Sequence, residues 1–226
     1  IVTGDWSSDV CSSDLASTKA FLGQMLVLYL LCTKLSYEQK SINKKDYQKK
    51  IKDLLSLSKS AKNTLNIEDK IQTLGKDFAN SKGSMFLGRG YSYPIALEGA
   101  LKLKELAYVH AEGYPAGEMK HGPLALIEEG MPVVVIAPRD EHYKKTISNM
   151  QEVISRGAKV LLITNKSTDE IYSENIWEQI EVDAISDELI PFLTTIPLQK
   201  LAYYSALDKG YDIDKPRNLA KSVTVE

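Results

Sequence analysis

Apolar residues recur at helical spacing in the first third of the chain. Phe21, Met25, Leu28 and Cys32 follow one another at intervals of three or four residues, with Ser17 or Thr18 before them as an N-cap. The next stretch is rich in lysine but keeps a rough apolar stripe, which is typical of an amphipathic helix with a solvated face. The pattern predicts helices over residues 16–35, 37–63 and 67–80.

The pattern changes near residue 83 to short apolar runs separated by helical stretches. Unbroken runs such as 132–137 and 159–164 are typical of strands that are buried on both faces of a parallel sheet. Strands in this alternation require right-handed crossovers. We therefore predict an α/β fold, a doubly wound sandwich with a mostly parallel sheet flanked by helices and preceded by a helical segment. Its expected strands cover 84–88, 132–137, 159–164 and 180–185, and its expected helices cover 92–110, 141–156 and 187–209.

Composition narrows the class of protein. The 226 residues are 43% hydrophobic and 26% charged with a net charge of −2, which is typical of a soluble globular protein and gives no basic surface for nucleic acid or an anionic membrane. Cys11 and Cys32 form no metal-binding or disulfide pattern, so we expect a reducing cytoplasm and no metal site. The apolar run from Ala20 to Cys32 is shorter than a membrane span requires, and we interpret it as a buried helix.

The first 15 residues differ from the rest. Ser-Ser-Asp occurs twice between Trp6 and Leu15, without the charged start or the cleavage site of a signal peptide. A genuine polar loop would also fit this composition. We expect residues 1–15 to be a non-native or disordered stretch.

A glycine turn follows the first expected strand. Gly88, Arg89 and Gly90 lie at its carboxyl end, where ligands bind in doubly wound folds. The turn and the helix after it could present backbone N–H groups to an anion, although the spacing matches neither the Walker nor the dinucleotide motif. We predict Arg89 and Gly90 as substrate-binding residues.

The helix after this turn carries three charges on one face. Glu98, Lys102 and Glu105 are spaced four and three residues apart, which brings their side chains within mutual reach. A surface ladder of ion pairs is the ordinary explanation for such spacing. Here apolar residues surround the stripe, which favours a buried helix with its charges in a cleft. A base in such a cleft could move a proton between neighbouring carbons of a sugar, and Glu105 or Glu98 could serve.

Two further residues are candidates for chemistry. His121 precedes Gly-Pro and is therefore expected in a turn, where a neutral imidazole is suited to proton transfer. Lys221 lies in an irregular C-terminal tail and could act as an amine nucleophile toward a carbonyl. His110 and His142 have no supporting neighbours, and we interpret them as structural or solvent-exposed.

Four stretches together resemble a known family. They are Ala-Ser-Thr-Lys-Ala-Phe at 16–21, the run from 87 to 125 with its Glu-Met-Lys-His-Gly-Pro, Thr-Ile-Pro-Leu-Gln at 195–199, and the ending Asp-Lys-Pro-Arg-Asn-Leu-Ala-Lys-Ser-Val-Thr-Val-Glu at 214–226. The chain resembles the sugar isomerase (SIS) domains of glutamine–fructose-6-phosphate aminotransferases from about residue 16 to its end. The ending is the most specific part, since other SIS proteins generally lack it.

The resemblance implies an activity and a role for each matched residue. The family aminates fructose 6-phosphate with ammonia from glutamine and isomerises the product to glucosamine 6-phosphate. By resemblance, Glu105 is the base that moves the proton between two sugar carbons, and Lys221 forms a Schiff base with the open sugar. His121 opens the sugar ring from the neighbouring subunit of a homodimer, and Glu98 with Lys102 supports the base.

The resemblance also implies the organisation of the chain. Ser17 and Ala220 match positions that line the sugar site, and no cofactor is implied. We expect a helical segment from the end of a first SIS subdomain plus a connector at 16–82, a second SIS subdomain at 83–213 and an active-site tail at 214–226. The glutaminase domain and most of the first SIS subdomain are expected to be missing from this polypeptide.

Two other functions remain open. A phosphosugar-binding SIS module of a transcriptional regulator or kinase has the same fold, but the sequence contains no helix-turn-helix pattern. A related SIS enzyme that acts on another amino sugar is the second alternative.

Overall fold

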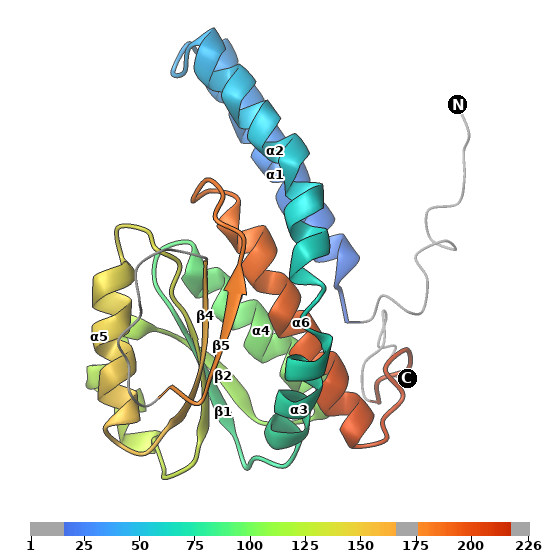
Figure 1. The fold of residues 1–226 in the computed structure, drawn as a ribbon, viewed down its shortest axis with the longest axis vertical. Coiled ribbons are helices and arrows are strands. Elements are labelled where there is room, and N and C mark those ends of the chain that lie inside the picture. Colours follow the sequence, from blue (N-terminus) through green and yellow to red (C-terminus); the bar gives the residue numbers. More distant parts are fainter. Residues whose placement is uncertain (1–15, 166–175, 218–226) are drawn as a thin grey trace, which may run out of the picture.

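The computed structural model describes residues 16–165 and 176–217. The expectation for residues 1–15 and the assignments of Ala220 and Lys221 fall outside these ranges. The predicted α/β class is confirmed, because a five-stranded sheet lies between layers of helices (Figure 1). The elements in chain order are α1 (Lys19–Glu38), α2 (Lys44–Thr64), α3 (Glu68–Ala79), β1 (Ser84–Gly88), α4 (Ser92–Ala107), β2 (Ala111–Pro115), η2 (Ala116–His121), η3 (Pro123–Leu126), β3 (Pro132–Ile136), α5 (Tyr143–Ile154), β4 (Lys159–Asn165), β5 (Glu178–Val182) and α6 (Ile190–Asp208).

The strands are parallel and stand in the order β2-β1-β3-β4-β5. Successive side chains of a strand point to opposite faces of the sheet. Met85 and Val133 accordingly pack with α5 in one apolar cluster, whereas Phe86 and Val134 pack with α3, α4 and α6 in the other. Burial on both faces explains why the central strands are continuous apolar runs.

The strand predictions are correct for three strands and incomplete for the other two. β1, β3 and β4 lie where the apolar runs placed them, whereas β5 begins and ends earlier than the predicted 180–185. β2 was not predicted. Its sequence, Ala-Glu-Gly-Tyr-Pro, is not apolar because this edge strand pairs with β1 alone and is only half-buried beyond Ala111.

The predicted helix over 37–63 is divided in the structure. α1 continues to Glu38, and Lys40 has a positive φ of 58° in the turn that follows. Asn43 then caps α2, because its side-chain oxygen accepts a hydrogen bond from the Asp46 backbone N–H at 2.9 Å. α1 and α2 form a hairpin that extends beyond the sheet (Figure 1).

The prediction that the apolar run of α1 is buried is wrong for this chain. Thr33 is the buried residue of α1, whereas the side chains of Val27 and Leu28 are 64% and 59% exposed. α2 covers one side of α1. Only the first turns of α1, with Phe21 and Met25, pack against the apolar cluster that contains residues of α3, α4 and α6. Within residues 16–165 and 176–217, α1 alone has the length and composition of a membrane span, a property it shares with core helices of soluble proteins.

Candidate active site on helix α4

A tight glycine turn carries the chain from β1 into α4. A Cβ atom on Gly88 would lie 2.3 Å from the carbonyl oxygen of Ser92, so no larger residue fits without moving the backbone. Gly90 has a φ of 52°, in the left-handed region that favours glycine. The backbone N–H groups of Ser92 and Tyr93 donate to carbonyls within this turn. Two of the donors that were expected to face an anion therefore have protein partners.

α4 holds the three predicted charges together. Lys102 Nζ lies 2.5 Å from Glu105 Oε2 and 3.5 Å from Glu98 Oε1. The Lys102 side chain is 3% exposed, and those of Glu98 and Glu105 are 11% and 18% exposed. This is not the exposed ladder of ion pairs that such spacing usually produces. An ammonium group enclosed between two carboxylates lies inside the protein.

Burial changes the electrostatics of this triad of Glu98, Lys102 and Glu105. Burial raises the pKa of the Glu98 carboxyl, the charge and hydrogen bonding of Lys102 lower it, and Glu105 adds a smaller increase. Burial prevails, so the pKa of Glu98 lies above its ordinary value. Glu98 Oε1 is buried, and its contact with Lys102 Nζ at 3.5 Å is long for a hydrogen bond. Groups of this kind are more frequent at functional sites than in ordinary cores.

The start of α1 is attached to the same layer of helices. The carbonyl oxygen of Thr18 accepts a hydrogen bond from Gln199 Nε2 of α6 at 3.3 Å. Ala16 is buried in the cluster that also contains Ala100 and Leu103 of α4. Ser17, predicted to line the sugar site, is therefore held between two residues that contact the layer formed by α4 and α6.

Arg89 lies on the other face of the sheet. Its guanidinium group lies beside the Asn149 side chain of α5, and a Cβ on Gly117 would be 2.4 Å from Nη2. α5 packs on the face opposite α4. The structure thus gives the Arg89 side chain neighbours in η2 and α5 and does not bring it to the triad.

His121 ends η2, a short 3-10 helix, and not the simple turn that was expected. Its side chain is 76% exposed, and Nε2 lies 4.0 Å from Glu118 Oε2 of the same element. η2 is anchored by Met119, which is buried in the cluster on the α5 face. Within one chain, the structure therefore does not bring His121 to the triad.

His142, which we interpreted from the sequence as structural or solvent-exposed, lies in a cavity. The cavity has a volume of about 340 Å³, is also lined by Gly90, Asp140 and Asp187, and lies next to the carboxyl ends of β1 and β3. Asp140 Oδ1 accepts a hydrogen bond from the His142 backbone N–H at 2.8 Å. The acidic residues around this histidine disfavour a phosphate, although the position in the fold is one where ligands bind. The signal in the sequence was the polar Arg-Asp-Glu-His run at 139–142, directly after a buried strand.

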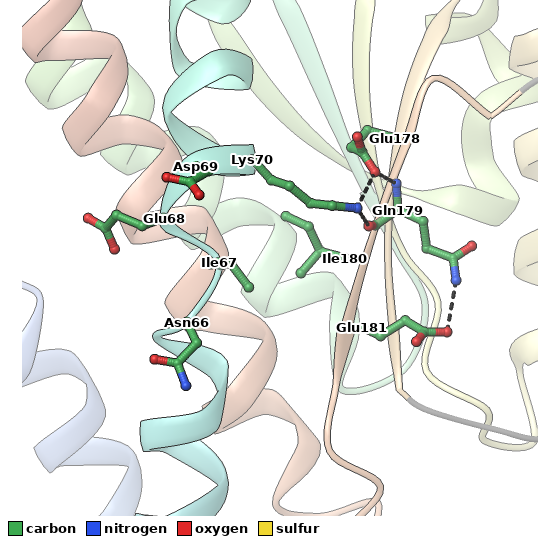
Figure 2. Close-up of a pocket in the computed structure, with 9 residues that line it drawn as sticks. All are labelled: Asn66, Ile67, Glu68, Asp69, Lys70, Glu178, Gln179, Ile180 and Glu181. Carbon is green, nitrogen blue, oxygen red and sulfur yellow. Dashed lines mark hydrogen bonds and ion pairs between the residues drawn. The ribbon is translucent and has the colours of Figure 1, made fainter.

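A cavity of about 640 Å³ lies between α3 and the edge strand β5. Figure 2 shows Lys70 reaching from α3 to β5, where Nζ lies 2.8 Å from Glu178 Oε1 and 3.4 Å from the carbonyl oxygen of Gln179. The lysine thus covers a backbone acceptor on an edge that would otherwise be open to pairing with another strand. We interpret this contact as protection of the sheet edge.

A second cavity of about 640 Å³ separates α1 from the first turns of α4 and α6. Its lining is mostly apolar and includes Phe21 of α1, Ile95 of α4, and Lys50 and Glu188, which form an ion pair. Among the residues that the structure describes, no three His, Cys, Asp or Glu side chains are placed to share a metal ion.

Comparisons with known proteins identify the chain's relatives. The model of the SIS domain family matches residues 77–208. The glutamine–fructose-6-phosphate aminotransferase (isomerizing) of Bacteroides thetaiotaomicron is 50% identical over 211 residues, and that of Bartonella quintana is 45% identical over 211 residues. Each match covers 93% of this chain but 34% and 35% of the respective relatives. The chain therefore spans about a third of the length of these curated proteins.

Solved structures agree in fold. The C-terminal domain of glucosamine-fructose-6-phosphate aminotransferase from Francisella tularensis superposes with a TM-score of 0.85 at 41% identity, covering 88% of this chain and 56% of that one. A glucosamine-6-phosphate deaminase from Thermotoga maritima superposes with a TM-score of 0.57 at 21% identity, covering 90% and 57%. The second likeness concerns the fold alone.

Proposed function

The chain belongs to the SIS domain family, and on that premise we propose that it is the isomerase part of a glutamine–fructose-6-phosphate aminotransferase. In this role it would convert fructose 6-phosphate and ammonia derived from glutamine into glucosamine 6-phosphate. The identity of 45–50% with proteins of that name supports the proposal. So does the TM-score of 0.85 with the C-terminal domain of a relative.

The observation that carries the proposal is the buried Lys102 between Glu98 and Glu105. Enclosing a cation and two acids is costly, since ion pairs in a protein interior seldom add net stability over apolar residues. An enzyme that moves a proton between two carbons needs a carboxylate held in a fixed position. Because the Glu105 carboxylate is fixed by Lys102 at 2.5 Å and remains partly exposed, it can reach a substrate.

The chemistry assigns a role to each group. The Lys221 amine attacks the carbonyl carbon of open-chain fructose 6-phosphate, and water leaves as a Schiff base forms. Ammonia then replaces the lysine. Glu105 takes a proton from carbon 1 and returns it to carbon 2, while the proton of the carbon-1 hydroxyl passes to the imine nitrogen, which turns the ketose imine into the 2-amino aldose. In this scheme Glu98 and Lys102 position Glu105.

The remaining predicted residues complete the proposed site. We propose that Ser17 and Ala220 line the sugar pocket, that Arg89 and Gly90 contribute to substrate binding near the β1–α4 turn, and that His121 opens the sugar ring. The structure separates His121 and the Arg89 side chain from the triad within one chain, which fits a histidine donated across a cytoplasmic homodimer. No cofactor is part of this scheme.

The lengths of the relatives bear on activity. Since the chain matches about a third of them, the glutaminase part and most of a first SIS subdomain would be supplied by other sequence. In this proposal, 16–82 is the end of that subdomain plus a connector, 83–213 is the second SIS subdomain and 214–226 is the active-site tail. We expect the isolated chain to convert fructose 6-phosphate far more slowly than a full-length relative.

The test is a chimaera in which residues 16–226 replace the matching segment of the Bacteroides thetaiotaomicron relative. Treatment with borohydride in the presence of fructose 6-phosphate should reduce the Schiff base and attach the sugar to Lys221. Lys221→Arg should abolish this adduct, whereas Lys215→Arg, on the same segment, should leave it unchanged. An adduct that persists in Lys221→Arg would assign the chain to another activity of the SIS family.

A further inference from the structure

His121 is carried by a short element whose position depends on its neighbours. η2 has six residues and 3-10 geometry, in which internal hydrogen bonds are poorer than in an α-helix and residues three apart lie on the same side. Ala116 and Met119 share one such side and are buried in the apolar cluster on the α5 face. Glu118 and His121 share another side and are exposed. The contacts of the buried side therefore determine where the imidazole stands.

A buried asparagine of α5 lies at this contact. Asn149 is 7% exposed. In the amide orientation that pairs both of its polar atoms, its nitrogen donates to the carbonyl oxygens of Lys145 at 3.0 Å and Ala116 at 3.2 Å. The first bond lies within α5, and the second crosses to the first residue of η2. Because a buried donor or acceptor without a partner costs free energy, this position favours a side chain that can donate to both carbonyls.

Two further contacts hold the same element. The Arg89 guanidinium group lies between η2 and α5, since Nη2 is 3.3 Å from the Asn149 amide group and a Cβ on Gly117 would clash with it. Lys120 Nζ lies 3.0 Å from Glu152 Oε1, about one turn further along α5 than Asn149. Asn149 contacts both η2 and Arg89, so its amide lies at the centre of this attachment.

We propose that Asn149 is a positioning residue that attaches η2 to α5 and thereby fixes His121 for opening of the sugar ring. This inference rests on the proposed function, in which His121 acts on the ring of fructose 6-phosphate. The Asn149 amide is buried beneath η2 and does not touch the substrate. Its effect on the reaction passes through Ala116 and the short helix that carries the imidazole.

Ring opening depends on where the imidazole stands. The bond between carbon 2 and the ring oxygen breaks, the anomeric hydroxyl loses its proton as the carbonyl forms, and the ring oxygen gains a proton. A histidine that transfers this proton must come within about 2.6–3.2 Å of each oxygen. A displacement of about 1 Å can lower a rate about 100-fold. Loosening η2 should therefore slow ring opening and leave substrate binding nearly unchanged.

The first test measures the attachment in the 226-residue chain. Hydrogen–deuterium exchange with peptide mass spectrometry follows the backbone amides of residues 116–121. Asn149→Ala and Asn149→Leu both remove the donor, and leucine keeps most of the side-chain volume. We expect exchange in η2 to be about fivefold faster in both variants, with exchange in α4 unchanged.

Thr146→Val is the matched control, because it removes a hydrogen bond within α5, from Oγ1 to the carbonyl oxygen of His142. Exchange in η2 should stay as in wild type in this variant. Unchanged exchange in η2 of Asn149→Leu, or the same increase in Thr146→Val, would overturn the proposal.

The second test uses a substrate that needs no ring opening. Fructose 6-phosphate closes through its 5-hydroxyl, so an analogue that lacks this hydroxyl stays open. In the chimaera that contains residues 16–226, Asn149→Leu should lower kcat about tenfold for fructose 6-phosphate, with KM within about twofold. For the open analogue, kcat should stay within about twofold of the unmodified chimaera. His121→Ala should show the same dependence on the substrate, and adding Asn149→Leu to it should cause no further loss.

These measurements separate positioning from structural damage and from the proposed function. A general loss of structure would lower activity on both substrates, and a direct role in binding would raise KM; either result would overturn the proposal. A chimaera that forms the borohydride-trapped adduct but loses equal activity on both substrates in Asn149→Leu would keep the function and refute the positioning role. A chimaera without the adduct, together with faster exchange of η2 in Asn149→Leu, would refute the function and keep the attachment.

Discussion

Replacing Lys102 by methionine tests whether the triad is an enclosed set of charges. Methionine keeps the unbranched shape of the lysine stem but removes the ammonium group. Glu98 and Glu105 would then face each other with side-chain exposures of 11% and 18% and no cation between them. Two carboxylates in such a position repel, and neither is fully hydrated.

The expected cost follows from the burial. Removing one partner of a buried ion pair costs about 3–5 kcal/mol, because the other charge is left uncompensated. Because the two acids remain partly exposed, we expect Lys102→Met to lower the free energy of unfolding by about 3 kcal/mol, at the lower end of that range. This is a large share of the 5–15 kcal/mol that stabilises a typical domain. For a chain of this size it corresponds to a fall in Tm of about 6–12 °C.

The loss of stability caused by Lys102→Met should increase as the pH rises. Burial raises the pKa of Glu98, and Lys102 lowers it, so loss of the lysine raises this pKa further. A carboxyl whose folded-state pKa is raised contributes stability that is complete below its unfolded pKa of about 4.3 and lost as pH rises through the folded pKa. The deficit of Lys102→Met relative to wild type should therefore be smaller near pH 5 than near pH 8.

Urea unfolding followed by circular dichroism measures the deficit at both pH values. Lys104→Met, an exposed lysine of the same helix, should cost less than about 0.5 kcal/mol. Replacing Glu98 and Glu105 by glutamine in the Lys102→Met background should restore part of the lost stability, since no charge then remains buried. A Lys102→Met chain as stable as Lys104→Met at pH 8, or a deficit that grows as pH falls, would refute the reasoning.

Two further predictions concern the turn and the hairpin. Gly88→Ala should lower the free energy of unfolding by at least about 2 kcal/mol in urea titrations, because its Cβ would meet the Ser92 carbonyl oxygen at 2.3 Å; an unchanged midpoint would contradict the tightness of the turn. Leu28→Glu combined with Leu31→Glu should reduce self-association in light scattering while changing Tm by less than about 2 °C, because both side chains are more than half exposed. A large fall in Tm would mean that α1 is packed more tightly than the structure indicates.

The sequence predicted features that depend on local pattern. The apolar runs of β1, β3 and β4 identified a parallel sheet because both faces of those strands are buried. The apolar residues around Glu98, Lys102 and Glu105 indicated a buried helix, and Lys102 is 2% exposed. In both cases the apolar pattern along the element itself carries the signal, although distant elements supply the burial.

Features that depend on distant partners were missed. β2 is an edge strand, so its composition carries no apolar signal, and its pairing with β1 is what defines it. The apolar composition of α1 predicted burial, but burial requires a covering surface, and the described residues cover only one side of the helix. His142 lines a cavity with Gly90 and Asp187, which are distant in sequence and meet because their strands end at the same edge of the sheet.

The central claim is that Glu105 moves a proton between carbons of a sugar phosphate, and the chimaera that contains residues 16–226 tests it most directly. Glucosamine 6-phosphate formation from fructose 6-phosphate and glutamine is measured for the unmodified chimaera, for Glu105→Gln and for Lys104→Met. We predict an active chimaera, a fall of at least about 100-fold in kcat for Glu105→Gln with little change in KM, and no loss for Lys104→Met. A Glu105→Gln chimaera that keeps a third or more of the activity would contradict the account.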